Sequence, residues 1–150
     1  LMCMALHQDP DIFSLDIDGN DYYIAKAIFD GGGRPKIFVV EYNSVYGPNQ
    51  SVTVEYQDDF AFTTAHPTQL YYGVSIAGWR KFFKSRGYRF VTVDRNGVNA
   101  FFVDPAFFDP IFINNVVGLE FAENRYQYKK FRMPSKEQFP LIADQKLISI

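Results

Sequence analysis

The chain has 150 residues, of which 47% are apolar, 18% aromatic and 21% charged. This composition excludes a disordered chain and is typical of one globular domain with a sizeable core. The net charge of −2 argues against broad electrostatic binding to nucleic acid, so we expect no nucleic-acid partner.

The cysteine and histidine counts, together with the first residues, predict a cytoplasmic protein without a membrane partner. The single cysteine, Cys3, excludes an internal disulfide, and the two histidines lack the spacing of a zinc site. Residues 1–6 are apolar but too short to span a membrane, and they lack the basic start of a signal peptide. The chain does not begin with Met, and we interpret residues 1–8 as the end of a helix whose start is missing, which predicts a fragment.

An apolar run over residues 12–17 leads into a turn rich in acidic and amide side chains. The run lacks the alternation of a half-exposed strand, which predicts a strand covered on both faces, as in parallel sheets. Residues 21–29 follow with the spacing of a helix. Ligands of open α/β sheets bind outside the carboxyl ends of the strands, so this turn is a candidate site. Its polar residues are Asp16, Asp18, Asn20 and Asp21.

The alternative is that Asp18 or Asn20 only caps the helix, because both side chains accept hydrogen bonds from free backbone N–H groups. Three acidic residues within six positions are more than a cap needs. We therefore interpret the turn as a functional site on a strand-to-helix connection.

A second apolar run predicts another strand over residues 36–43, with Glu41, Tyr42 and Asn43 at its end. Two strands joined by one helix form a right-handed βαβ unit, so their carboxyl ends lie at the same edge of the sheet. Asp16 and Glu41 then face one crevice, as metal ligands, as an acid/base pair or as hydrogen-bond acceptors for a ligand. The alternative is a solvated strand end.

Residues 44–72 are long for a connection, and long ordered loops tend to be functional. We expect a lid or a substrate-selecting insert. Alternation at Val52 and Val54 predicts a short strand or hairpin inside it. His66 is a candidate general base, although a lone histidine in a loop is more often simply exposed.

Residues 76–86 show the spacing of a helix with an apolar stripe, and Ser75 is placed to cap it. Two further apolar runs follow, separated by Asn96 and Gly97. This pair is a strong hairpin signal because both residues tolerate positive φ. Residues 88–103 therefore predict two antiparallel strands at the end of the sheet.

The pattern weakens after residue 104, where prolines interrupt short apolar pieces. A helix over residues 120–131 is the clearest element there. We interpret residues 105–150 as a C-terminal packing appendage to an α/β half-domain that spans residues 1–104 and carries the insert at 44–72.

The order of these elements is similar to the carboxy-terminal half of a class I S-adenosylmethionine-dependent methyltransferase domain, in which the last strand returns antiparallel into an otherwise parallel sheet. Residues 15–22 (LDIDGNDY) resemble the KIDVEGAE stretch of FkbM-like methyltransferases, and residues 39–43, 87–88 and 98–103 resemble the strands that follow it. The resemblance covers about residues 9–103. It implies a Rossmann-like, mostly parallel sheet with a terminal antiparallel hairpin, in an incomplete three-layer α/β domain.

The resemblance also implies S-adenosylmethionine as the cofactor and methyl transfer to a hydroxyl of a small-molecule acceptor such as a sugar. By this match the catalytic residues are Asp16, Asp18 and Glu41, and the donor contacts come from Asp16, Asp18 and Asn20. The acceptor contacts are Asp21, Tyr42, Asn43, His66 and Tyr72. The family's first strand with its glycine-rich turn, and its ribose-binding acidic residue, have no counterpart here, so we expect this chain alone to bind the donor poorly.

Two other functions share some of these features. An apolar strand ending in Asp-x-Asp-Gly also resembles haloacid dehalogenase-like phosphatases, in which Asp16 would be the nucleophile, Asp18 the acid/base and Mg²⁺ the cofactor. That family has Thr or Val after the glycine and an acidic pair at a strand end, whereas here Asn20 follows the glycine and Asp58-Asp59 lack a preceding apolar run. The third function is a non-catalytic domain whose Tyr-rich insert binds a partner, because exposed tyrosines are common at interfaces.

Overall fold

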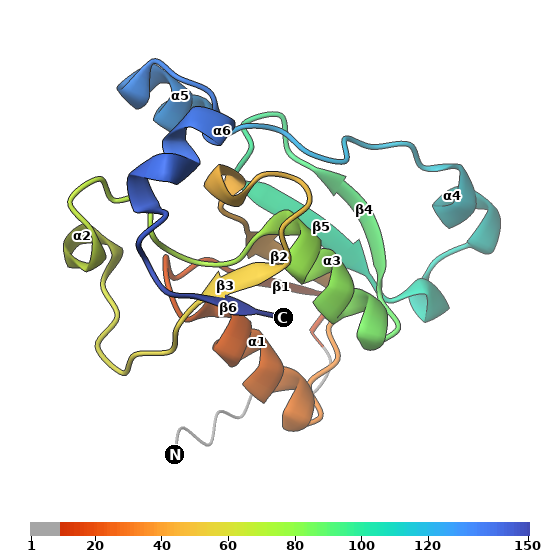
Figure 1. Cartoon of the computed structure of the whole chain (residues 1–150). Coiled ribbons are helices and arrows are strands. Elements are labelled where there is room, and N and C mark those ends of the chain that lie inside the picture. The colour runs from red at the N-terminus through yellow and green to blue at the C-terminus, as the bar shows by residue number, and fades with distance from the viewer. Residues whose placement is uncertain (1–9) are drawn as a thin grey trace.

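The computed structural model describes residues 10–150, so the predicted helix end at residues 1–8 lies outside the described residues. Figure 1 shows the elements in space. The strands are β1 (Ile12–Leu15), β2 (Ile37–Glu41), β3 (Val52–Val54), β4 (Arg89–Val93), β5 (Asn99–Val103) and β6 (Leu147–Ser149). The α-helices are α1 (Asp21–Asp30), α2 (Phe62–Ala65), α3 (Ile76–Ser85), α4 (Pro110–Asn115), α5 (Arg125–Phe131) and α6 (Ser135–Gln138). Short 3-10 turns span Ser44–Tyr46, Pro105–Phe107 and Phe139–Ile142.

The main sheet has four strands in the order β1-β2-β5-β4. β1 and β2 are parallel, with Ile12 opposite Ile37. β5 is antiparallel to both of its neighbours, and its Phe102 lies opposite Phe38 of β2. The α/β class is confirmed, and the sheet is mixed. β3 and β6 form a separate antiparallel pair.

Helices α1 and α3 cover one face of the main sheet, in front of it in Figure 1. The core between them is aromatic: Phe83 of α3 stacks on Phe102 of β5 with ring centroids 4.2 Å apart and contacts Phe29 of α1 at 6.0 Å. The indole N–H of Trp79, also buried, donates to the backbone carbonyl of Glu41 at 2.7 Å. This bond ties α3 to the end of β2, where the candidate site begins.

The other face of the sheet stays partly open, which corrects one prediction. Ile12 is 60% exposed, Ser14 is exposed, and Val39 and Phe101 are only half-buried. The strand at residues 12–17 was predicted to be covered on both faces, and this is wrong: Phe13 and Leu15 pack into the core on one face, whereas Ile12 and Ser14 are exposed on the other. Periodicity alone could not show this, because an apolar run does not reveal whether another layer covers each face of the sheet.

The predicted helix over residues 76–86 is confirmed as α3, and its Ser75 side chain accepts from the N–H of Gly78 at 3.0 Å. The antiparallel hairpin of β4 and β5 is also confirmed. Only its turn chemistry differs. Gly97 has positive φ but Asn96 does not, and the Asp94 carboxylate instead accepts from the N–H of Asn96 at 3.0 Å.

The insert at residues 44–72 packs against the C-terminal segment. Val45, Val54, Leu70 and Tyr71 share a second apolar cluster with Ile142. The short strand expected around Val52 is confirmed as β3, but it pairs with β6 near the end of the chain. The C-terminal segment therefore completes the packing of the insert. None of the helices in residues 10–150 is long and apolar enough to cross a membrane.

Gly97→Ala is expected to lower the free energy of unfolding by about 2 kcal/mol, as measured by urea titration. The φ of Gly97 is 73°, and a Cβ atom there would lie 2.3 Å from the backbone of Glu123. Gly47→Ala is the matched control: the φ of Gly47 is 69° but a Cβ would meet nothing within 4 Å, so only the left-handed strain of about 1 kcal/mol remains. Equal losses in the two variants would contradict the close approach of Glu123 to the hairpin.

Candidate functional site

The turn between β1 and α1 is held in shape by Asp21, which is only 1% exposed. Its carboxylate accepts from the N–H of Ile17 at 3.0 Å and from the N–H of Gly19 at 2.8 Å. Burial raises the pKa of Asp21, while these backbone bonds oppose the increase. Asp18 sits on top of this turn with φ of 54°, a left-handed conformation that is uncommon outside glycine and is concentrated at functional sites.

The turn is also fixed to the insert. A Cβ atom on Gly19 would lie 2.4 Å from the ring of Phe60, so only glycine allows this approach without a shift of the ring. Asn20 donates from its amide to the carbonyl of Gln57 at 2.6 Å. Asn20 occupies the N-cap position of α1 but makes no side-chain cap bond, so the cap alternative is wrong for this residue.

Three carboxylates meet at the carboxyl ends of β1 and β2. One oxygen each from Asp16, Asp18 and Glu41 lies within 4.8 Å of the other two. The parallel pairing of β1 with β2 places these ends at one edge, as the βαβ argument predicted. Asp16 and Glu41 lie close together, as predicted, and Asp18 joins them; of the three, Asp18 and Glu41 line the hollow described below.

Glu41 is the most deeply buried member of this acidic cluster. Its side chain is 9% exposed, and its Oε2 has no hydrogen-bond partner. Burial, followed by the negative charges of Asp16, Asp18 and Asp21, raises the pKa of Glu41 to about 9. Burial and the charge of Asp16 also raise the pKa of Asp18. Glu41 therefore holds a proton at neutral pH in the metal-free protein.

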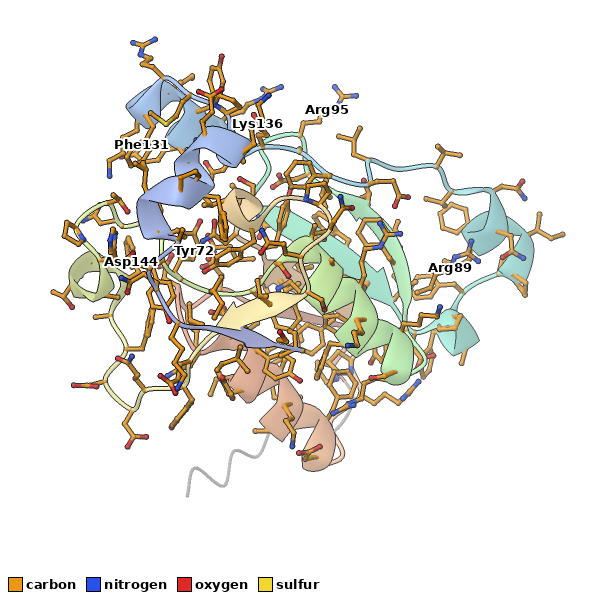
Figure 2. All side chains as sticks on the ribbon, in the orientation of Figure 1. Tyr72, Arg89, Arg95, Phe131, Lys136 and Asp144 are labelled. Carbon is orange, nitrogen blue, oxygen red and sulfur yellow. The ribbon has the colours of Figure 1, made fainter. Side chains whose placement is uncertain are left out.

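A hollow of about 210 Å³ opens beside the acidic cluster. Tyr72 lies on its wall, in the interior below α5 and α6 in Figure 2, and its hydroxyl accepts from the side-chain amide of Gln127 at 3.0 Å. Desolvation raises the pKa of this hydroxyl well above its usual range. The hollow is lined by Asp18, Glu41, Phe62, Thr68, Gln69, Leu70, Tyr72, Asn124, Tyr126, Gln127, Lys130 and Phe131.

Known proteins offer no guide here. No family model matches the sequence, and neither a curated protein nor a solved structure is similar to it. Function therefore has to follow from the chemistry of the site and from the short resemblance in the sequence.

Several lining residues were missed by the sequence analysis. Asn124, Gln127 and Lys130 come from α5 and its cap, in the part interpreted as a packing appendage, and Thr68 and Gln69 come from the insert. A polar residue on a short helix carries no sign of which cavity it will reach, because that depends on how the C-terminal segment folds back.

Four of the five predicted acceptor contacts, Asp21, Tyr42, Asn43 and His66, do not line the hollow. The hydroxyl of Tyr42 donates to the carbonyl of Ala122 at 2.7 Å, and the amide of Asn43 donates to the carbonyl of Leu70 at 2.7 Å, so both are used inside the fold. His66 shares a 2.8 Å hydrogen bond with Thr68 in its own loop. Of the five predicted contacts, the structure brings Tyr72 to the hollow and leaves Asp21 in the turn beneath it.

A larger hollow of about 420 Å³ lies elsewhere, between the end of β4 and residues 117–119. Its acidic residue, Asp94, accepts hydrogen bonds from the backbone N–H groups of the hairpin turn, at 3.0 Å from Val98 for example. The acidic cluster, in contrast, has a buried oxygen without a partner. The smaller hollow is therefore the candidate site.

Proposed function

We propose that this chain is the acceptor-side part of an S-adenosylmethionine-dependent methyltransferase domain that methylates a hydroxyl of a small molecule. The observation that carries the proposal is the position of β5, which returns antiparallel between β2 and β4 at the end of the sheet. This is the sheet ending that the FkbM-like resemblance implies. The candidate site also lies at the carboxyl edge of the parallel pair, where such domains bind their ligands.

The open surfaces of β1 support an incomplete, Rossmann-like sheet. β1 has a free edge within residues 10–150; its Ile12 is 60% exposed, and Ile17, just after the strand, is 50% exposed. Apolar strand residues at a free edge are a site for pairing with a further strand. In the proposed domain this edge receives the strands that bind the donor, and the open face receives the third layer.

The described residues fit only one end of the donor. The acidic cluster suits the positively charged amino group on the methionine part of the donor. Residues 10–150 contain no glycine-rich strand-to-helix turn to bind the remainder of the donor. Asn20, predicted to contact the donor, already binds Gln57. When bound, the donor supplies an electrophilic methyl group. The residues of this chain hold the acceptor in the hollow. Asp18, which lines the hollow, orients or deprotonates the hydroxyl of the acceptor.

Binding of S-adenosylhomocysteine, measured by calorimetry, tests the proposal. We expect a Kd weaker than about 1 mM for the 150-residue chain, and about 10 µM for the chain extended by any in-frame coding sequence upstream of Leu1. Asp16→Asn in the extended chain should weaken binding about tenfold. A stop codon directly upstream, or an extended chain that folds but does not bind, would overturn the proposal.

The acidic cluster also favours a second candidate, the Mg²⁺-dependent phosphatase, because Asp16 and Asp18 lie close enough to share an ion. That function predicts Mg²⁺-dependent hydrolysis of p-nitrophenyl phosphate by the 150-residue chain, abolished in Asp16→Asn. A non-catalytic binding domain predicts neither phosphate hydrolysis nor donor binding. The two assays together separate the three functions.

A further inference from the structure

The acidic cluster of Asp16, Asp18 and Glu41 has the dimensions of a cation site. Its three oxygens lie within 4.8 Å of one another. Two oxygens on opposite sides of one ion are separated by twice the metal–oxygen distance, which is about 4.2 Å for Mg²⁺ and about 4.8 Å for Ca²⁺. The printed spacing fits an ion of the size of Ca²⁺, and the three oxygens must move slightly closer by side-chain rotation to bind an ion of the size of Mg²⁺.

Gln127 provides an independent observation from another part of the chain. It is 6% exposed, lines the same hollow as Asp18 and Glu41, and its Oε1 has no hydrogen-bond partner. Its amide nitrogen is fixed by the bond to Tyr72. A buried oxygen without a partner is costly, and both residues that carry one, Gln127 and Glu41, line the same hollow. A cation is the kind of ligand that such oxygens can bind.

No protein cation neutralises the cluster. Within residues 10–150, no ion pair joins Asp16, Asp18 or Glu41 to a lysine or arginine. Lys130 lines the hollow, but its ammonium donates to the side chain of Gln69 at 3.1 Å. Asp16 and Asp18 carry like charges at this spacing, so the arrangement favours a bound positive charge.

We propose that Asp16, Asp18 and Glu41 bind one hard divalent cation, of the class of Ca²⁺, Mn²⁺ and Mg²⁺, with the Oε1 of Gln127 as a further oxygen ligand. All of these donors are hard oxygens, which select such ions over zinc or copper. The remaining coordination positions face the hollow, where water or an oxygen of a bound molecule fills them. The proposal rests on the geometry of the cluster in the chain without a donor; where a donor binds, its amino group and the cation compete for the same carboxylates.

Titration of the 150-residue chain with Mn²⁺ alone tests the site, because free Mn²⁺ gives a paramagnetic resonance signal that disappears on binding. We expect one Mn²⁺ per chain with a Kd of about 0.1 mM, competition by Mg²⁺, and a higher melting temperature. Asp16→Asn and Glu41→Gln should each weaken binding by about tenfold or more. Asp59→Asn, an equal charge change on an exposed residue of the insert, should leave the affinity unchanged.

Gln127 is tested by two opposite changes. Gln127→Leu removes the oxygen and should weaken Mn²⁺ binding several-fold, whereas Gln127→Glu adds a charged ligand and should strengthen it. No Mn²⁺ binding by the folded wild-type chain at millimolar concentration would overturn the proposal, as would an equal loss in Asp59→Asn and Asp16→Asn. Because no donor is present in these titrations, their result is independent of the S-adenosylhomocysteine experiment.

Discussion

Glu41→Gln is expected to raise the free energy of unfolding of the metal-free protein by about 2 to 3 kcal/mol at pH 7. The pKa of Glu41 rises from 4.5 to about 9 on folding, because the side chain is buried and faces Asp16 and Asp18. The folded state must therefore keep a proton on Glu41 that the unfolded state has released. Gln removes this cost, and its amide can donate to the neighbouring carboxylate.

The stability difference between Glu41→Gln and the wild type depends on pH, because the pKa of Glu41 differs between the folded and unfolded states. Below pH 4.5 Glu41 is protonated in both states, so the variant and the wild type should differ little. Between pH 4.5 and 9 the wild type loses stability relative to the variant, and above pH 9 the difference levels off. Urea unfolding in EDTA at several pH values measures the difference.

Glu120→Gln is the control for this experiment. Glu120 is an exposed surface residue that forms an ion pair with Arg80. Removing its charge should change the free energy of unfolding by less than about 1 kcal/mol at any pH. A Glu41→Gln variant that is less stable than the wild type throughout the pH range would show that Glu41 stabilises the fold. If the variant is more stable but binds no Mn²⁺, the residue is kept at a cost to stability, as is common for functional groups.

The location of the site could be predicted from the sequence because it follows from local rules. Apolar runs that end in Asp16 and Glu41, joined by one helix, require two parallel strands with their carboxyl ends together. The glycine at position 97 likewise marks the hairpin without reference to the rest of the chain. These signals depend on neighbouring residues only.

The remaining parts of the site could not be predicted, because they depend on contacts between distant segments. Gln127 reaches the hollow because the start of α5 is fixed to distant segments: the N–H of Asn124 donates to the hydroxyl of Ser44, and the N–H of Arg125 donates to the carbonyl of Asn96. Asn20 is a residue type that often caps helices, yet its side chain makes no cap bond and its amide donates to the carbonyl of Gln57 in the insert. In both cases a partner far along the chain decides the role of a polar side chain, and no local pattern records that partner.

The second large effect is expected from Asp21→Ala, which should lower the free energy of unfolding by about 3 kcal/mol and abolish Mn²⁺ binding. The variant leaves the N–H groups of Ile17 and Gly19 without their acceptor, the first at a partly buried and the second at a buried position. These bonds also hold the turn that keeps Asp18 in its left-handed conformation beside Asp16. Loss of the turn therefore separates the carboxylates even where the protein still folds.

Asp109→Ala is the matched control, because Asp109 also accepts from two backbone N–H groups, those of Ile111 at 2.8 Å and Phe112 at 3.0 Å, but on an exposed helix cap. Its loss should cost about 1 kcal/mol and leave Mn²⁺ binding intact. Asp21→Asn keeps one oxygen as an acceptor and should give an intermediate loss of stability. Equal effects of Asp21→Ala and Asp109→Ala, measured by urea unfolding and Mn²⁺ titration, would show that Asp21 is an ordinary cap and that other contacts position the acidic cluster.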